Sequence, residues 1–404
     1  MTLASSSLVN VRAIKEATFG VTPGSGNPTN LRVTSESLSY DLSKKASDEI
    51  KSSRTVSSMI SVGATVTGNL AQEVHYAGIE PFMESALQST FTEFGTDGVG
   101  AATSTTSISA TEITAASATS GANIFTALKK GQWFRITSAG ANNGKILRVS
   151  TTTAPTTTVI TLDTNTPGAV SSSESIQIQA ARLTHGTTQT SWTIERENSD
   201  IGVFMAFKGC TPSKMSLKVA SGSLSTVSFD FMGQSALEGT ATMLPGTPVA
   251  APTYDIHSGV SGATNAIWMD GAPVSGTYVK SVSLDYDNAL RAQDAIGTLG
   301  AIGIGSGTLV AKATVEVYFA NKDLFTKFRQ NTNTSLIFAT TDSSGNGYIV
   351  TLPVACIESW KSNAGGKDQD QMISMSLYAL SDDSNADATL RKAIFVDRIG
   401  SAVV

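Results

Sequence analysis

An internal repeat constrains this chain more than any other feature of its sequence. Residues 35–41 (SESLSYD) return as residues 281–287 (SVSLDYD), at an offset of 246 residues. Residues 70–82 match residues 313–325 at an offset of 243. Matches that keep their order along both halves indicate tandem copies of one structural unit. The sequence therefore predicts two similar domains rather than one large one.

The repeat continues after a long interruption in its first copy. Three further matches follow in order at offsets of 144 to 146 residues: 190–191 with 334–335, Cys210 with Cys356, and 228–232 with 374–378. The fall of the offset from 243 to 144 means that about 99 residues are present in the first copy alone. We predict a first domain from residues 31–89 and 190–236, an insertion at 90–189, and a second domain at 278–381.

Each copy has the pattern of a β-rich domain with one flanking helix. Residues 58–76 alternate between apolar and polar side chains, which is the period of a strand with one face on a core. Residues 76–88 instead place apolar side chains at helical spacing, with Pro81 in the first turn. Only 15% of the residues are charged, and the abundant Thr fits the pleat of a sheet. The predicted fold class is all-β, with two tandem β-rich domains, each with one flanking helix, and one small inserted β domain.

The remaining segments are assigned from their composition. Residues 1–30 are rich in turn formers and are predicted to be an N-terminal arm, with one short strand around Leu8–Ile14. Three strand-like runs at 132–137, 145–150 and 159–162 indicate that the insertion is a small β domain. Residues 237–277 are predicted to be a linker and residues 382–404 a C-terminal tail.

Charge and hydropathy exclude several classes of protein. The net charge of −5 argues against a protein that grips nucleic acid, because such binding needs a basic surface. Residues 295–311 lack charge but are only 17 residues long and contain five glycines, whereas a membrane span needs about 20 predominantly apolar residues. The N-terminus lacks the pattern of a signal peptide, so we expect folding in a reducing cytoplasm. We predict no membrane contact.

No catalytic or metal-binding constellation stands out. His75, His185 and His257 are far apart and lack metal-ligand spacing, and two cysteines without a flanking histidine are expected to be buried packing residues. The glycine-rich run 303–307 lacks the lysine of a phosphate loop. The acidic run 382–387 lacks the central glycine and distant glutamate of a calcium loop. We therefore predict that the protein is not an enzyme and uses no cofactor.

Several segments carry a resemblance to a known family. They are residues 31–42 (LRVTSESLSYDL), 44–45, 47–50, 53–54, 62–63, 198–200 (NSD) and 207–212 (FKGCTP). In these segments the N-terminal half resembles the tail tube proteins of long-tailed bacteriophages. The resemblance is strong over residues 31–89 and 190–236 and is supported by the repeat over 278–381. It implies a structural virion protein of the tail tube whose sandwich domains each add one sheet to a continuous barrel around a lumen.

The same resemblance implies a set of partners. It implies self-assembly into stacked rings built around a tape-measure protein, bounded by tail-terminator and tail-tip proteins, and assembled in the host cytoplasm. Double-stranded DNA then passes through the lumen on ejection without specific binding. Open sheet edges favour such closure, because a ring removes them. With two copies of the domain per chain, we expect a homotrimeric, pseudo-six-fold ring, and a homohexamer is the alternative.

Two sets of residues are candidates for these roles. Polar faces of predicted strands nominate four lumen-facing residues: Glu73, Asp230, Lys312 and Glu316. An acidic lumen would repel DNA phosphates and let the duplex slide. By position, the loop 46–54 would reach a neighbouring subunit or ring, and its charged residues, with two just before it, are Lys44, Lys45, Asp48, Glu49, Lys51 and Arg54. Its counterpart at 288–307 lacks this charge cluster and is rich in glycine instead.

A second hypothesis comes from a different class of protein. The Ser/Thr-rich insertion is also typical of an adhesive or carbohydrate-binding β module on the virion surface. Clustered exposed aromatic side chains would favour sugar binding, but the four tryptophans are dispersed along the chain. Trp192 and Trp360 also lie in repeat strands, where packing in a core is the usual role.

Overall fold

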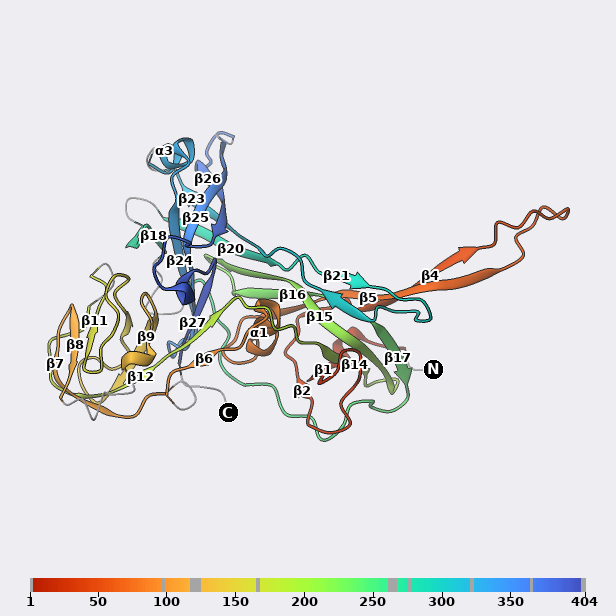
Figure 1. The fold of residues 1–404 in the computed structure, drawn as a ribbon, viewed down its shortest axis with the longest axis horizontal. Coiled ribbons are helices and arrows are strands. Elements are labelled where there is room, and N and C mark those ends of the chain that lie inside the picture. The colour runs from red at the N-terminus through yellow and green to blue at the C-terminus, as the bar shows by residue number, and fades with distance from the viewer. Residues whose placement is uncertain are drawn as a thin grey trace.

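The structure is a computed structural model that describes residues 3–95, 99–116, 125–164, 168–260, 267–274, 278–319, 323–363 and 366–400. Strands dominate these residues, which confirms the all-β fold class (Figure 1). Among the described residues the two α-helices are α1 (Glu80–Leu87), inside the predicted helix 76–88, and α3 (Asp323–Gln330), at the matching place in the second copy. Neither helix, nor any other in the described part of the chain, is long and apolar enough to cross a membrane.

Eight antiparallel strands lie side by side in one sheet, here termed the long sheet. Four come from the first half of the chain and four from the second, and the pairing of β15 with β20 joins the two sets. The order across the sheet is β4 (Ser39–Ala46), β5 (Met59–Glu73), β16 (Thr226–Gly233), β15 (Val203–Ala220), β20 (Val279–Asp287), β23 (Val310–Tyr318), β26 (Met372–Leu380) and β25 (Gly347–Asn363).

The two sets of four strands have the same order and almost the same register. Strands β4, β5, β16 and β15 correspond to β20, β23, β26 and β25. Tyr40 pairs with Val66, and Tyr286, its match at offset 246, pairs with Ala311. A β-bulge falls at Ser213 in β15 and at Glu358 in β25, 145 residues later. The long sheet is thus a structural tandem repeat.

The strand pairings correct the alignment of the two cysteines. Thr211 pairs with Met232, and Cys356 pairs with Tyr378, the match of Met232 in β26. Cys356 therefore corresponds to Thr211, and the alignment with Cys210 is wrong by one residue. The consequence is visible in burial, because Cys210 is buried and Cys356 is partly exposed. A one-residue shift in a strand turns the side chain to the opposite face.

Glu73 and Glu316 are also not equivalent. Ala71 pairs with Ser228, and Glu316 pairs with Ser374, the match of Ser228. Glu316 therefore corresponds to Ala71, two residues from the predicted position. Because side chains alternate with a period of two, this shift leaves Glu316 on the predicted face.

A second layer of strands covers one face of the long sheet. β15 and β25 are 18 and 17 residues long, and their N-terminal halves leave the long sheet to pair in this layer. In the first half the layer contains β14 (Trp192–Asn198), β1 (Val9–Lys15), β2 (Thr29–Asn30) and β17 (Ser235–Gly239). In the second half it contains β24 (Thr334–Thr341), β18 (Trp268–Met269), β19 (Ala272–Pro273), β27 (Phe395–Ile399), β13 (Ala181–Thr184) and β6 (Thr92–Glu93).

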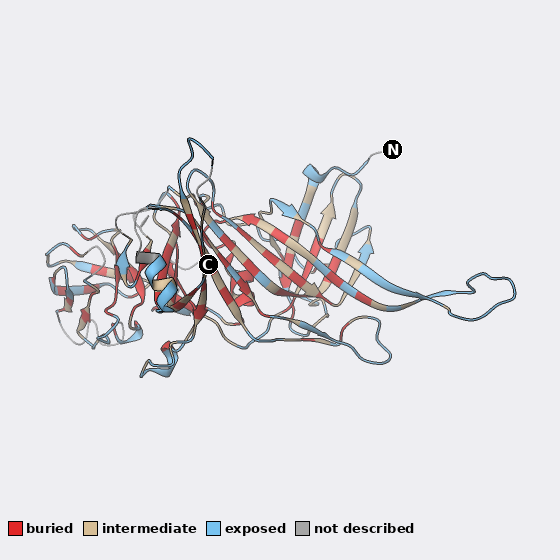
Figure 2. Ribbon diagram, turned by 90° about the horizontal axis from the view of Figure 1, so that it is seen from above, coloured by how far each residue is buried: buried red, intermediate tan, exposed pale blue. Residues whose placement is uncertain are grey.

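The core lies between these two layers. It is one continuous cluster that includes Val66, Phe229 and Leu284 from the long sheet and Phe207 and Leu336 from the second layer. Along the long sheet, buried residues alternate with partly exposed ones, as Figure 2 shows. The opposite face of the long sheet carries polar side chains, as the alternation in residues 58–76 predicts.

Segments outside the predicted repeat domains complete the second layer. β1, from residues assigned to an N-terminal arm, pairs with all seven residues of β14. β17 extends into the segment assigned as a linker and pairs with β15, and β27, from the segment assigned as a tail, pairs with β25. Within the first repeat, β15 is a single strand that contains Gly209 at φ 67°.

The central part of the segment 90–189 forms a separate six-stranded sheet with its own core, whereas β6 and β13 near its two ends belong to the second layer. Its strands are β7 (Thr103–Ile108), β8 (Glu112–Ala115), β9 (Trp133–Ser138), β10 (Ile146–Arg148), β11 (Val159–Thr161) and β12 (Ser175–Gln179). It packs on the side of the second layer that faces away from the long sheet: Trp133 lies 5.1 Å from Trp268 between ring centroids. This module and the β4–β5 hairpin are at opposite ends of the molecule (Figure 1).

Several short strands and turns extend or connect these layers. β3 (Ser35–Glu36) pairs with β5 ahead of β4 along the same edge. β21 (Arg291–Gln293) and β22 (Gly303–Gly305) form a small hairpin between β20 and β23. Three 3-10 turns occupy Ser6–Leu8, Phe125–Ala127 and Ala388–Leu390.

Candidate assembly surfaces

The polar face of the long sheet brings together all four candidate lumen residues. Glu73, Asp230, Lys312 and Glu316 project from β5, β16 and β23 on the same side of one sheet. Three of them make short-range contacts there: the Asn69 amide donates to Asp230 at 2.6 Å, and the Ser281 hydroxyl donates to Glu316 at 2.9 Å. Lys312 pairs with Glu358 at 2.8 Å.

More charged residues line this face than the sequence pattern identified. A hollow of about 420 Å³ crosses the junction of the two repeats there. At its edge Lys214 lies 3.1 Å from Asp287, and this hydrogen-bonded carboxylate raises the pKa of the lysine. Lys44, opposite Ser61, continues this face onto the arm. Along the body of the sheet the face carries more carboxylates than ammonium groups: Asp41, Glu73, Asp230, Asp285, Asp287, Glu316 and Glu358 with Lys214, Lys218, Lys312 and Lys361.

The two ends of the long sheet are open edges. In the described part of the chain, β4 pairs only with β5, and residues 356–363 of β25 pair only with β26. The corresponding part of β15 pairs on both sides, with β16 and with β20. An open edge presents unpaired backbone groups and is a template for pairing with another chain. The sheet therefore has two different edges that can each accept a strand.

The β4–β5 hairpin extends away from the body of the molecule as a long arm (Figure 1). Lys44 and Lys45 lie near the end of β4, where the arm begins. The other predicted loop residues, Asp48, Glu49, Lys51 and Arg54, lie in the connection between β4 and β5. All six are exposed. Lys51 is 3.6 Å from Glu49, an exposed pair that contributes little to stability. The charges therefore keep the arm solvated without fixing it to this copy of the chain.

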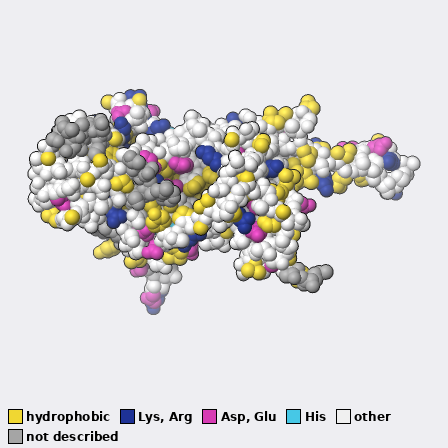
Figure 3. All heavy atoms as spheres, turned by 90° about the horizontal axis from the view of Figure 1, so that it is seen from below, with side chains coloured by type: hydrophobic (Ala, Val, Ile, Leu, Met, Phe, Trp, Pro, Cys, Tyr) yellow, Lys and Arg dark blue, Asp and Glu magenta, His cyan; other side chains and the backbone are white. Residues whose placement is uncertain are grey.

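The arm also exposes apolar side chains that the charge cluster concealed in the sequence. Met59, Ile60 and Val62 on β5 are 65%, 64% and 52% exposed, and Leu42 on β4, which pairs with Ala64, is 41% exposed. Hydrophobic side chains gather where the arm leaves the body (Figure 3). Near the tip, Ile50 is almost fully exposed. Contiguous exposed apolar surface of this kind is typical of protein–protein contact sites.

The corresponding connection in the second half packs onto the first half of the same chain. The Ala64 amide donates to the Leu299 carbonyl at 2.7 Å, and the Gln234 side chain donates to the Ala301 carbonyl at 2.8 Å. Ala301 and Ile304 are buried in this contact. A loop that follows the edge strand of one repeat thus covers the neighbouring repeat.

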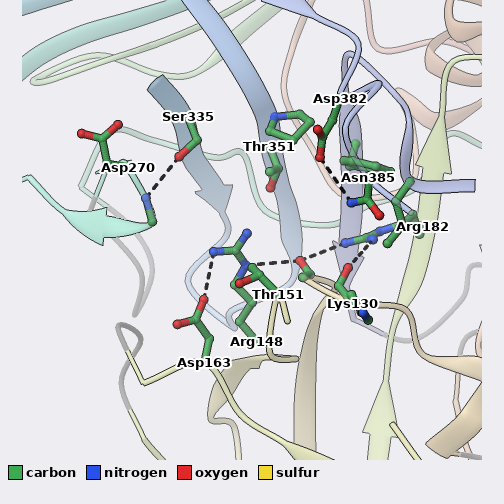
Figure 4. Close-up of a pocket in the computed structure, with 15 residues that line it drawn as sticks. Lys130, Arg148, Thr151, Asp163, Arg182, Asp270, Ser335, Thr351, Asp382 and Asn385 are labelled. Carbon is green, nitrogen blue, oxygen red and sulfur yellow. Dashed lines mark hydrogen bonds and ion pairs between the residues drawn. The ribbon is translucent and has the colours of Figure 1, made fainter. Parts of the chain in front are cut away.

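A polar cleft of about 330 Å³ lies where the inserted module meets the second layer (Figure 4). Its two arginines are neutralised by carboxylates: Arg148 lies 3.1 Å from Asp163, and Arg182 lies 2.6 Å from Asp397. Arg182 also donates to the carbonyls of Lys130 and Gly131. Because these groups already satisfy one another, the cleft is a structural junction that fixes the module in place.

Three of the four tryptophans are packed inside the protein, whereas the fourth, Trp360, lies in a partly exposed aromatic cluster. Trp133 and Trp268 are buried against each other at this junction. Trp192 packs on Phe82 at 5.1 Å and donates to the Ser85 hydroxyl at 2.7 Å. These contacts are those of core residues, so they give no support to the carbohydrate-binding hypothesis.

Two of the histidines lie buried where the end of β5 meets β24 and the segment that contains His257. Nδ1 of His75 is 2.9 Å from the Glu73 carbonyl, and Nδ1 of His257 is 3.1 Å from the Thr340 hydroxyl. Burial lowers the pKa of His75 and lowers that of His257 to about 4. Both are thus neutral packing residues at pH 7.

The described residues contain no group of three or more His, Cys, Asp or Glu side chains that could hold a metal ion. Cys210 is buried, and burial raises the pKa of its thiol well above the usual value. A thiol in this state is a poor nucleophile.

Comparison with known proteins gives one family. The family model described as "phage tail tube protein" matches residues 6–379, nearly the whole chain. No curated protein matches the chain.

Proposed function

The chain belongs to the phage tail tube protein family, and we propose that its copies close into rings whose stacking forms the conduit for double-stranded DNA. As a member of that family it is a structural protein of the virion tail that assembles with itself into a tube. The ring, its stoichiometry and the passage of DNA are the parts that we propose.

The single observation that carries the proposal is the long sheet with its two open edges. One chain contributes eight strands in two pseudo-equivalent sets of four, joined by β15 and β20. Repeating that junction between chains extends the sheet in one direction only, because the two edges differ. A head-to-tail interface of this kind closes into a ring when its rotation permits. Three chains give 24 strands and pseudo-six-fold symmetry, and a ring of six chains is the alternative.

The polar face suits the wall of a DNA conduit. Its carboxylates outnumber its ammonium groups, and Lys214 and Lys312 are each held by a carboxylate. A wall with net negative charge repels phosphate and gives no basic stripe for counterion release. We therefore assign Glu73, Asp230, Lys312 and Glu316 to the lumen, where the duplex slides without specific binding.

The inserted module then faces outward. It packs on the far side of the second layer from the polar face, so that it leaves the lumen free in the proposed ring. We propose that a tape-measure protein occupies the lumen during assembly in the host cytoplasm. Tail-terminator and tail-tip proteins would cap the two ends of the tube.

Electron microscopy of the concentrated purified protein tests this proposal. We expect end-on views of rings or tubes with a central hole and a nearly six-fold outline. Particles that stay monomeric at high concentration, also when a tail-tip initiator and the tape measure are supplied, would contradict it.

A further inference from the structure

The junction between the two repeats is a template for the contact between two chains. Seven residue pairs join β15 to β20, from Lys214 opposite Asp287 to Ala220 opposite Ser281. On the core side, Met215 lies opposite Tyr286, and both are 2% exposed. On the polar side, the Ser216 hydroxyl donates to Asp285 at 2.6 Å. Both faces of this junction are thus complementary within one chain.

The two open edges carry the equivalents of these residues. Trp360 pairs with Met375 in β26 as Met215 pairs with Phe229 in β16, so Trp360 takes the place of Met215. Tyr40 takes the place of Tyr286 at offset 246. Trp360 and Tyr40 are only partly buried, each packed against the edge of the core. They are the two halves of a core pair that the single chain leaves incomplete.

The helices show the same incompleteness. The last turn of α1 is buried, and its Ala86 carbonyl accepts a hydrogen bond at 2.7 Å from the Asn288 side chain, just after β20. The matching end of α3 is largely exposed. Phe325 of α3 and the neighbouring Phe319 are 37% and 42% exposed. In the first repeat this surface is covered by the connection that follows β20, whereas in the second repeat it is bare.

We propose that β4 of one chain pairs antiparallel with β25 of the next, in the register that β20 keeps with β15. Trp360 then lies opposite Tyr40, Lys361 opposite Ser39, and Ser359 opposite Asp41. This inference rests on the proposed ring and names the surfaces and the register by which a second copy of this chain binds. The contact is heterologous, so every chain uses one edge of each kind.

Apolar and charged groups on the two edges support a second copy of this chain as the partner. The base of the arm, with exposed Leu42, Ile60 and Val62, continues the core-facing side of β4 and β5 beyond the body. In the proposed register it reaches the bare aromatic cluster in which Trp360 lies 4.8 Å from Phe325 between ring centroids. On the polar side, Asp41 lies diagonally across from Lys361, within reach of a long side chain. The first-repeat arm thus covers the next chain's second repeat, as the 288–309 connection covers the first repeat within the chain.

Paired cysteines test the register. The test variant is S39C/K361C, and its matched control is S216C/D285C, which places cysteines at the equivalent pair inside one chain. Both are made with Cys356→Ser, so that no other partly exposed thiol remains. Directly opposed residues in antiparallel strands are about 4.5–5.5 Å apart between Cα atoms, within the range that a disulfide spans. Oxidation uses copper phenanthroline on assembled protein, and non-reducing electrophoresis reads the product.

We expect the control to form an intrachain bond without a change in mass, and the test variant to form covalent dimers and trimers. The shifted pair S37C/K361C should link far less. If microscopy shows rings and the control links, but the test pair does not, the register is wrong while the tube function stands. If neither rings nor interchain links form under assembly conditions, the ring proposal fails together with the register.

Discussion

The two repeats have one fold but different surroundings, and the difference shows what the isolated chain lacks. In the first repeat, Met215 is 2% exposed because β20 covers it, and Phe82 is 1% exposed in a helix whose last turn contacts the connection after β20. In the second repeat, Trp360 and Phe325 occupy the corresponding edge and helix and remain partly exposed. A repeat therefore completes its core only when another repeat follows it. In a chain with two copies, the second must find its cover in another molecule.

The largest expected effect comes from placing a charge at the two equivalent core positions. Met215→Asp buries a carboxylate inside the chain, which should cost about 3 kcal/mol or more of folding free energy and leave the protein insoluble or unfolded. Trp360→Asp at the open edge should cost folding much less but abolish ring formation. Thermal unfolding and sedimentation of both variants measure the contrast. Equal loss of folding in the two variants would show that Trp360 is as much a part of the single chain's core as Met215.

Removal of the two connections should separate assembly from stability. Replacement of residues 48–57 by Asn-Gly shortens the exposed arm to a tight hairpin, so we expect an unchanged melting temperature and weakened ring contact. Replacement of 294–302 by Asn-Gly removes the Leu299 and Ala301 carbonyls that hold the first repeat, so the melting temperature should fall. Calorimetry and light scattering on both variants test this. An arm deletion that assembles normally would remove the arm from the interface.

Acid should weaken the fold of the single chain through its buried histidines. The unfolded chain protonates His257 near pH 6.5, whereas burial in the folded chain lowers its pKa to about 4. Stability is therefore full above pH 6.5 and falls as the pH drops toward 4, by up to about 3 kcal/mol for this residue. His257→Gln should flatten that dependence in chemical denaturation between pH 7 and pH 4. An unchanged slope would show that His257 does not stay neutral in the fold.

The smallest effect on the protein itself should come from the polar face. Glu73→Lys with Glu316→Lys makes that face more positive by about four charges, and both residues are at the surface of folded strands, so rings should still form. DNA ejection from phage that carry the variant should slow, because phosphate is then attracted to the wall. Glu112→Lys with Glu238→Lys makes the same charge change on exposed residues elsewhere. Equal ejection rates for the two variants would place the polar face outside the conduit.

The sequence predicted the order of elements better than it predicted their register. Similarity between the halves located β5, α1 and the insertion, because those matches depend on several residues in a row. It misaligned Cys356 and Glu316, since loops of different length shift a strand by one or two residues without changing the pattern of identities. Pairing across the sheet fixes the register, and only the structure contains that pairing.

Surfaces were predictable only where one strand shows its own alternation. The polar face of β5 was evident, whereas Asp285, Asp287 and Lys214 were missed because their face depends on which strands lie beside them. The short strand β1 was predicted within an arm, but β17 and β27 were assigned to a linker and a tail, since each is stable only through its pairing in the second layer. The apolar base of the arm was concealed because Leu42, Ile60 and Val62 follow the alternation of core residues.

Native mass spectrometry of the smallest closed ring tests the central claim most directly. If the second repeat of each chain is completed by the first repeat of the next, three chains of 41.9 kDa close the 24-stranded wall. We predict a ring of three chains, with a mass near 126 kDa, built from three copies of that 41.9 kDa chain. A closed ring of six chains would contradict the claim, because half of the repeats would then lie outside the wall.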